Sequence, residues 1–434
     1  MSMRGHHVAI GYHGGLLADP VRVHAYDRAL AALVRPGDVV LDVGAGTGIL
    51  SMLAVRHGAA RVHAVESGAV ADVARALVEA NGMADRITVH QADLVDLPPV
   101  EPVDLVVGDW LGRFVVDDEM LDAVAAARRW ARPDARFCPE RVDLHVGLLA
   151  QPIPTLTRWS IPLRGLDLTP ALPTARNQPI TLQVRPGSLC APGARVHVLT
   201  PGDLTVPTMQ ADVLITQATA VFGLLGWFDA HLAPGVTLST APGHPTHWNQ
   251  IAWPVPPTPL APGDHVHVEI GVEPHPDLPP QWRWSLQVRR RGERILDHTA
   301  SSAERPLGPP APTVDVEGAL TTGRSALQAG DLNAALGHLG AATRGMSRDD
   351  PRLPETHALL GTALAKAGLL TEAVDAMLAA VRDEPEPTAM AWLPTLYRML
   401  GQPDEAERWR REHLRHLGPW TDPGSGPWTD PSAG

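Results

Sequence analysis

Two aspartates flank a short apolar loop in the segment VVGDWLGRFVVDDEML, at positions 106 to 121. Asp109 and Asp118 are nine residues apart, and Glu119 follows the second directly. Two carboxylates around an apolar turn favour a positively charged ligand, because their charges complement a cation. A structural alternative exists, since Asp118 can simply cap the following helix DEMLDAVAAARRW. The rest of the sequence has to decide between a site and a cap.

A glycine-rich turn follows an expected strand in VVLDVGAGTGILS. Gly44, Gly46 and Gly48 allow the backbone to turn sharply into a helix and to approach a ligand closely. Their spacing is GxGxG, whereas dinucleotide-binding proteins use GxGxxG, so NAD is disfavoured. Asp42 lies just before the turn, where it would repel phosphates but suits an ammonium group. S-adenosylmethionine carries an ammonium group and no phosphate, so we predict it as the cofactor.

Acidic and apolar residues after the next two expected strands extend this cofactor site. Glu66 ends RVHAVE, 22 residues after Gly44, where an acidic side chain can accept hydrogen bonds from both ribose hydroxyls. The segment after the third strand is placed to meet the adenine. Its candidate residues are Asp93, Leu94 and Val95.

The elements that must position these residues change character along the chain. Short β-branched runs alternate with Ala-rich helical stretches, which predicts an α/β Rossmann-like domain with a parallel sheet. Short strands punctuated by Pro and Gly follow, as is typical of an antiparallel β-barrel, and then an all-α region. The expected boundaries are 1–35 for an N-terminal helical lid over the cofactor, 36–138 for the Rossmann-like domain, 139–304 for the barrel, 305–316 for a Pro-rich linker, 317–417 for the helices and 418–434 for a flexible tail.

The pattern of the helical region is typical of a repeat array. The turn glycines Gly330, Gly368 and Gly401 are 38 and 33 residues apart, close to the about 34 residues of a tetratricopeptide repeat. Small residues recur where such repeats pack closely, and a proline ends the second helix of the middle copy. These positions are Gly361, Ala373, Ala380 and Pro385, with Ala335 and Ala406 in the flanking copies. We expect a partner-binding array, with docking onto the core or another subunit as the alternative.

Composition narrows the class of protein. The chain has 434 residues, a formal net charge of −12 and 44% apolar residues, which favours packed domains and argues against nonspecific nucleic-acid binding. Cys138 and Cys190 are far apart and are predicted to be buried, reduced thiols. The histidines show no metal-ligand spacing, so no metal site is expected. Without a signal-peptide pattern or a long apolar run, we place the protein in the cytoplasm, away from membranes.

From about residue 12 to 300 the sequence resembles the protein arginine N-methyltransferase family. LDVGAGTGILS is similar to the family's cofactor motif, GDWLGRFVVDDEML to its acidic substrate loop, and STAPGHPTHWNQ to its Thr-His-Trp loop. YHGGLLADPVRVHAY is similar to the family's N-terminal helix. GLDLTPALPTARN resembles the arm by which these enzymes form head-to-tail dimers, which implies a homodimer with its arm near 158–180.

The resemblance implies roles for individual residues. Arg22 would pair with the carboxylate of the cofactor, and Asp19 would form an acid–histidine pair with His247 beside the active site. The implied catalytic residues are Asp109, Asp118, His247 and Asp19. The cofactor residues are His13, Arg22, Asp42, Gly44, Gly46, Gly48, Glu66, Asp93, Leu94, Val95 and Met120. The substrate residues are Asp109, Asp118, Glu119 and Trp248.

The acidic loop departs from the family pattern. The family carries glutamates at both acidic positions, whereas Asp109 and Asp118 are each one methylene shorter. Two carboxylates can clamp a guanidinium and polarise one nitrogen towards the methyl donor. We therefore predict an S-adenosylmethionine-dependent N-methyltransferase that acts on arginine in a protein or peptide, or on an arginine-like small molecule. The alternative is a catalytically impaired scaffold that acts through its repeats.

Overall fold

The structure is a computed structural model that describes residues 10–116, 120–160, 166–273, 280–307 and 315–417. It divides into two compact units. Unit 1 comprises residues 1–151 and 177–304, and unit 2 comprises residues 152–176 and 305–434. Of the expected segments, the tail 418–434 and the centre of the Pro-rich linker lie outside the described residues.

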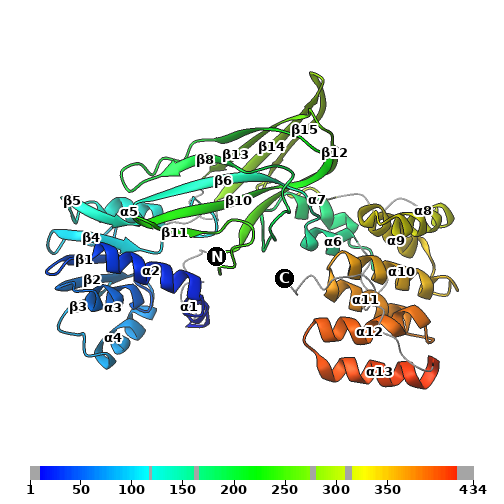
Figure 1. Ribbon diagram of the computed structural model, residues 1–434, viewed down its shortest axis with the longest axis horizontal. Coiled ribbons are helices and arrows are strands. Elements are labelled where there is room, and N and C mark those ends of the chain that lie inside the picture. Colours follow the sequence, from blue (N-terminus) through cyan, green and yellow to red (C-terminus); the bar gives the residue numbers. More distant parts are fainter. Residues whose placement is uncertain (1–9, 117–119, 161–165, 274–279, 308–314, 418–434) are drawn as a thin grey trace. The chain divides into compact units, whose positions relative to one another are not determined.

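Unit 1 begins with the predicted α/β domain (Figure 1). Its five strands form a parallel sheet in the order β3-β2-β1-β4-β5. Every residue of β1 is buried, as expected where helices cover both faces of a parallel sheet. The strands are β1 (Val39–Val43), β2 (Arg61–Glu66), β3 (Ile87–Gln91), β4 (Val103–Gly108) and β5 (Ala131–Cys138). The helices are α1 (Ile10–Leu17), α2 (Pro20–Leu33), α3 (Ile49–Arg56), α4 (Val70–Ala80) and α5 (Met120–Ala127).

The strand order reverses between β1 and β4, which both connect to loops of the predicted site. β1 pairs with β2 on one side and with β4 on the other, and Val43 lies opposite Gly108. The loops that follow β1 and β4 therefore leave the same edge of the sheet side by side, where open α/β sheets bind their ligands. A Cβ on Gly108 would lie 2.8 Å from the carbonyl oxygen of Val43, so glycine permits this close approach.

Two antiparallel sheets complete unit 1, as the sequence predicts. The first has the order β7-β12-β10-β6-β8 with β11 paired to β10, and the second has the order β15-β14-β13-β9. Trp253 and Trp282 pack with ring centroids 5.1 Å apart in a shared core that also contains Trp284. The strands of the first sheet are β6 (Arg141–Leu149), β7 (Ile180–Leu182), β8 (Ala194–Leu199), β10 (Thr219–Ala233), β11 (Val236–Ser239) and β12 (Gln250–Leu260). Those of the second are β9 (Met209–Leu214), β13 (His265–Glu273), β14 (Gln281–Arg290) and β15 (Glu293–Ser301).

The described part of unit 2 is helical, and its helices from α8 onward form three consecutive hairpins. Each of the glycines Gly330, Gly368 and Gly401 has a positive φ at the end of the first helix of a hairpin, where a left-handed residue terminates a helix. Ala335, Ala373 and Ala380 are fully buried or nearly so. The helices are α8 (Val316–Ala329), α9 (Leu332–Gly345), α10 (Leu353–Lys366), α11 (Leu370–Ala380), α12 (Pro387–Met399) and α13 (Pro403–Leu417).

The segment expected as an arm of the barrel belongs to unit 2. It carries α6 (Pro154–Ser160), the 3-10 turn η2 (Thr169–Ala171) and α7 (Leu172–Arg176). Arg158 donates to Asp375 of α11 at 2.8 Å, and Thr174 donates to the carbonyl oxygen of Pro306. The chain therefore leaves unit 1 after β6, contributes these short helices to unit 2, and returns before β7.

Both cysteines are free and buried, as predicted. Burial raises the pKa of the Cys190 thiol, so it is protonated at neutral pH. None of the described helices combines the length and the apolar character needed to cross a bilayer.

Candidate active site

The glycine-rich loop after β1 is held by Glu66 at the end of β2. Oε2 of Glu66 accepts a hydrogen bond from the backbone N–H of Gly46 at 2.9 Å, and Oε1 accepts one from Gly68 at 2.6 Å. Gly44, Gly46 and Gly48 all have positive φ, which explains why the loop needs glycine. The sequence predicts Glu66 as a ribose ligand. In this structure its two oxygens organise the loop, and each retains a lone pair for a further donor.

His13 of α1 closes over the same loop. Its ring is 6% exposed, and a Cβ built on Gly46 would lie 3.2 Å from it. A side chain at position 46 would therefore collide with His13. The predicted lid residue and the predicted cofactor loop are in contact.

Asp42 is a fully buried carboxyl group beneath the loop. Its Oδ2 accepts a hydrogen bond from the hydroxyl of Ser51 at 2.6 Å, from the first turn of α3. Within the described residues its Oδ1 is buried and has no hydrogen-bond partner. Burial raises the pKa of Asp42 to about 6, although the Ser51 hydrogen bond acts in the opposite direction. A buried carboxylate oxygen without a donor is costly, so this side of Asp42 is suited to a donor from a ligand.

The segment after β3 is fixed by an arginine from the turn that follows α5. Arg129 donates to the carbonyl oxygens of Leu94 and Val95 at 2.9 and 2.8 Å, and Asp93 accepts from the backbone N–H of Val95. The Leu94 side chain is buried in the core beneath the sheet, so it supports the loop from below. Val95 is 44% exposed. Of the two apolar residues predicted to contact adenine, Leu94 is therefore buried and Val95 is accessible.

Asp19 and His247 are adjacent, although 228 positions separate them in the sequence. Oδ2 of Asp19 accepts from the backbone N–H of His247 at 2.9 Å and lies 3.0 Å from its Nδ1. Burial lowers the pKa of His247, in opposition to its hydrogen bond with Asp19. Burial would also raise the pKa of Asp19, but its hydrogen bonds from Arg22 and His247 outweigh this, and the pKa lies below its usual value. The pair is therefore a carboxylate and a neutral imidazole at neutral pH.

Arg22 is a buried cation paired with Asp109. Nε of Arg22 donates to Oδ2 of Asp109, and Nη1 donates to the carbonyl oxygen of Leu16 at 3.4 Å. Oδ1 of Asp109 is buried and has no hydrogen-bond partner within the described chain. The sequence predicts that Arg22 binds the cofactor and Asp109 the acceptor. The structure shows that these two residues form an ion pair with each other.

Helix α2 and its N-cap position the side chains of Asp19, Arg22 and Tyr26. Asp19 caps its N-terminus by accepting from the backbone N–H of Arg22 at 3.0 Å. Arg22 and Tyr26 lie on the same face, four residues apart. The buried Tyr26 hydroxyl donates to the carbonyl oxygen of Gly108 at 3.1 Å. One helix thus reaches the end of β4 with Arg22 and Tyr26 and the loop after β11 with Asp19.

The loop that begins at Asp109 is anchored in the core of unit 1. Trp110, Leu111 and Phe114 are all buried, and the ring of Phe114 packs edge-on against Trp253 of β12 with centroids 5.3 Å apart. The loop is apolar because its side chains pack into the core of unit 1. This packing fixes Asp109 between the parallel sheet and the antiparallel sheets. Asp118 and Glu119 lie outside the described residues, and so does the side chain of Met120 at the start of α5.

The Thr-His-Trp segment contributes one accessible and one buried ring. Trp248 is 6% exposed and packs edge-on against Phe228 at 5.7 Å, so its ring mainly anchors the loop. Its centroid lies 3.8 Å from that of His247. Oγ1 of Thr246 is buried without a partner among the described residues.

Two residues of the candidate site, Ser51 and Tyr26, were not predicted from the sequence. Ser51 lies one turn after Gly48 on α3, and a hydroxyl in the first turn after a cofactor loop is a signal that could have found it. Tyr26 follows Arg22 by four residues, so its helical spacing also placed it on the same face. Its partner is a backbone carbonyl, and no side-chain pattern reveals such a contact.

Comparisons with known proteins agree with this geometry. A family model described as ribosomal protein L11 methyltransferase (PrmA) matches residues 27–129. The histone-arginine methyltransferase CARMER of Drosophila mojavensis is 32% identical over 260 residues, which is 54% of this chain and 48% of that protein. The Trypanosoma brucei PRMT1 enzyme–prozyme heterotetrameric complex with AdoHcy is 25% identical, with a TM-score of 0.62, and the match covers 68% of this chain and 99% of that chain. Over about half of its length, the chain is similar to protein arginine methyltransferases.

The similarity to arginine methyltransferases covers part of the chain. The structure of Arabidopsis thaliana protein arginine methyltransferase 10 shares the fold, with a TM-score of 0.62 and 22% identity over 69% of this chain and 99% of that chain. The chain spans about half the length of the curated relatives that it matches. Its activity, acceptor and partners are therefore inferred below from the geometry of the site.

Proposed function

We propose that the protein is an S-adenosylmethionine-dependent N-methyltransferase that methylates the guanidino group of arginine in a protein or peptide. One observation carries the proposal. The buried Oδ1 atoms of Asp42 and Asp109 lack donors within the described chain; Asp42 lies near the end of β1, and Asp109 directly follows the adjacent strand β4. Such an arrangement suits two positively charged ligands side by side: the ammonium end of the cofactor and a guanidinium.

The residues around the glycine loop fit the cofactor. Asp42 would accept from its ammonium group and Glu66 from its ribose hydroxyls, while Arg22 would pair with its carboxylate. When bound, S-adenosylmethionine supplies an electrophilic methyl group on a sulfonium. His13 and the remaining predicted cofactor residues would close around it. The remaining residues are Gly44, Gly46, Gly48, Asp93, Leu94, Val95 and Met120.

Asp109 would hold the acceptor. A guanidinium is planar and always charged, so a carboxylate can fix its plane and leave one nitrogen directed at the methyl group. The contact of Arg22 with Oδ2 leaves Oδ1 of Asp109 as the oxygen suited to the acceptor. A second carboxylate, from Asp118 or Glu119, remains a prediction from the sequence.

His247 would receive the proton that methylation releases. Its Nδ1 faces Oδ2 of Asp19, a contact in which Nδ1 carries the hydrogen. Nε2 of a neutral ring then holds a lone pair and can accept a proton. Asp19 is a positioning residue here, because it fixes the tautomer of His247 and stabilises the imidazolium.

The relatives favour a protein acceptor over a metabolite, because the curated ones are named histone-arginine methyltransferases. The three helical hairpins of unit 2 would bind a partner protein in the manner of tetratricopeptide repeats. We also infer a homodimer, since the segment near 158–180 contains GLDLTPALPTARN, which resembles the family's dimerisation arm. The Trypanosoma brucei relative forms a heterotetrameric complex with a prozyme, so subunit association is known among relatives. Sedimentation of the full chain tests this association.

The deciding experiment incubates the protein with methyl-labelled S-adenosylmethionine and, separately, free arginine and an Arg-rich peptide pool. We expect mass spectrometry to find methylated guanidine in the peptide pool. Label only in free arginine would replace the protein acceptor by a small molecule. Cofactor binding without any methylated guanidine would overturn the proposal and favour a scaffold.

Asp109→Asn tests the assignment of the acceptor carboxylate. We expect transfer to fall by roughly a thousandfold, because a neutral amide cannot hold the guanidinium. The cofactor Kd, measured by calorimetry, should stay within about threefold, since Arg22 keeps its charge. Asp134→Asn, an exposed site on β5, is the matched control and should leave both values unchanged. A large loss of cofactor affinity in Asp109→Asn would contradict the assignment.

A further inference from the structure

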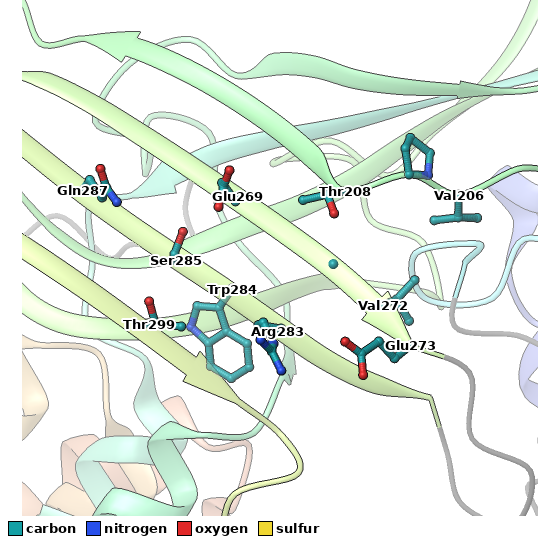
Figure 2. Close-up of a pocket in the computed structure, with 12 residues that line it drawn as sticks. Val206, Thr208, Glu269, Val272, Glu273, Arg283, Trp284, Ser285, Gln287 and Thr299 are labelled. Atoms are coloured by element: carbon teal, nitrogen blue, oxygen red, sulfur yellow. The ribbon is translucent and has the colours of Figure 1, made fainter.

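A second polar concavity lies on the antiparallel sheet formed by β9, β13, β14 and β15. Its volume is about 420 Å³, within the roughly 300 to 1,000 Å³ typical of ligand sites. Figure 2 shows polar side chains from β13, β14 and β15 gathered around it. We call it the sheet-face concavity. Its polar lining residues are Thr208, Glu269, Glu273, Arg283, Ser285, Gln287 and Thr299.

The concavity forms because a glycine interrupts the outer face of β13. Gly271 lies between Glu269 and Glu273 on the same face, opposite Arg283 of β14. A Cβ built on Gly271 would meet only the hydroxyl oxygen of Thr208, at 4.0 Å. The space above Gly271 is therefore open, and the rows of polar side chains on either side form its walls.

Ser285 provides an independent sign of a ligand. It is 9% exposed, and its hydroxyl oxygen is buried without a hydrogen-bond partner in the part of the chain that the structure describes. Glu269 and Thr299 flank it across the strands, in the same row of the sheet. An unpaired buried hydroxyl costs free energy, so a ligand that pairs with it gains affinity.

The charges and hydrogen-bonding atoms favour a cationic ligand that carries N–H groups. Glu269 and Glu273 outnumber Arg283, the one cation of the lining. Gln210 donates to Oε1 of Glu269 at 2.7 Å, and His267 approaches the same oxygen at 3.6 Å, so Oε2 of Glu269 can accept from a ligand. The hydroxyls of Ser285 and Thr299 and the amide oxygen of Gln287 add further acceptors.

We propose that the sheet-face concavity binds the guanidinium or ammonium group of an arginine or lysine side chain that flanks the methylated residue in a peptide substrate. The concavity lies on the face of the sheet that carries Glu269, Gly271 and Glu273. That the cationic side chain belongs to a peptide substrate rests on the proposed function, whereas the binding of a cationic side chain does not. The site would add affinity for substrates that carry several positive charges.

Two variants test the site with the full chain. Glu269→Gln with Glu273→Gln removes the negative charge, and Gly271→Val fills the space with a residue that strands favour. The probes are a peptide with several arginines and the same peptide with citrulline at all but one of them. For the wild type we expect tighter binding of the multi-arginine peptide by calorimetry. Each variant should weaken that binding roughly fivefold and leave the citrulline peptide unaffected.

The matched control is Glu293→Gln, which removes an exposed carboxylate from β15 of the same sheet outside the concavity. It should bind both peptides as the wild type does. Equal affinity of wild type, charge variant and Gly271→Val for the multi-arginine peptide would overturn the inference. Binding to free L-arginine that depends on Glu269, without any difference between the peptides, would also overturn the peptide source.

The outcomes separate this inference from the proposed function. Glutamate-dependent peptide binding without methyl transfer would support the concavity and refute the methyltransferase. Methyl transfer with a peptide KM that both variants leave unchanged would support the enzyme and refute the concavity.

Discussion

Asp42 is a fully buried carboxyl group at the end of β1, and it accepts a hydrogen bond from Ser51. Its pKa is raised to about 6, so in the ligand-free protein it is largely protonated below pH 6 and ionised above it. Because the folded state holds this proton more tightly than an unfolded chain, the group stabilises the ligand-free fold at low pH and ceases to do so as pH rises through about 6. Its ionised form is the one that can bind an ammonium group.

Cofactor affinity should therefore increase as pH rises through about 6. Ser51→Ala removes the hydrogen bond that lowers the pKa of Asp42, so the midpoint should move upward by roughly one pH unit. Calorimetric titration of S-adenosylmethionine between pH 5 and 8 measures both midpoints. Identical pH profiles for the wild type and Ser51→Ala would contradict a role for Asp42 in binding the ammonium group.

A second prediction at the residue scale concerns Asp19 and His247. Asp19→Asn keeps a good N-cap for α2 but removes the charge that supports a protonated His247. We expect kcat to fall by about a hundredfold. The pKa of His247 is already lowered by burial, and the loss of Asp19 should lower it further, so the acid limb of kcat/KM should move to lower pH. An unchanged plateau rate together with an unchanged acid limb would exclude His247 as the base.

Helix–helix contacts in unit 2 depend on small residues at particular faces. Gly323 of α8 faces Leu339 of α9, and a Cβ there would lie 2.8 Å from the Leu339 side chain and 3.0 Å from its backbone nitrogen. Gly337, also inside α9, has open space around the corresponding position. Both glycines lie inside helices, but Gly323 is tightly packed and Gly337 is not.

Gly323→Ala should destabilise the first hairpin by about 1 to 3 kcal/mol, because the added methyl group has to push α8 and α9 apart. Gly337→Ala should stabilise it by up to about 1 kcal/mol, because alanine is the better helix former. Hydrogen exchange of amides in α8 and α9 of the full chain measures both changes. Equal protection in the two variants would contradict the close packing of this hairpin.

At the scale of the whole molecule, the negative charge should guide cationic substrates. The formal net charge is −12, and the concavity and the candidate acceptor site both present carboxylates. The KM for an Arg-rich peptide should therefore rise when salt is increased from about 0.01 to 0.15 M, since the Debye length shrinks from about 30 to 8 Å. The citrulline analogue with one arginine is the control and should respond less. Equal salt dependence for the two peptides would exclude long-range attraction.

Local patterns were sufficient to predict most elements and the cofactor loop. The β-branched run before Gly44 is a buried strand, and Gly44, Gly46 and Gly48 form the expected sharp turn into a helix, with positive φ values. Periodicity also placed the antiparallel sheets and the helical region. These features depend on neighbours in the chain, because strand burial, turn geometry and helix termination are local consequences of residue type.

Pairings between distant residues were decided only by the tertiary structure. Within unit 1, the Arg22–Asp109 pair and the use of Glu66 to hold Gly46 depend on which strands are neighbours, and the burial of Trp248 depends on which rings surround it. The membership of residues 152–176 in unit 2 has the same origin. By itself, the sequence determined the chemical groups and the local elements of this protein. The packing of sheets and helices decided which groups meet, because burial and pairing arise from contacts between segments that are far apart in the chain.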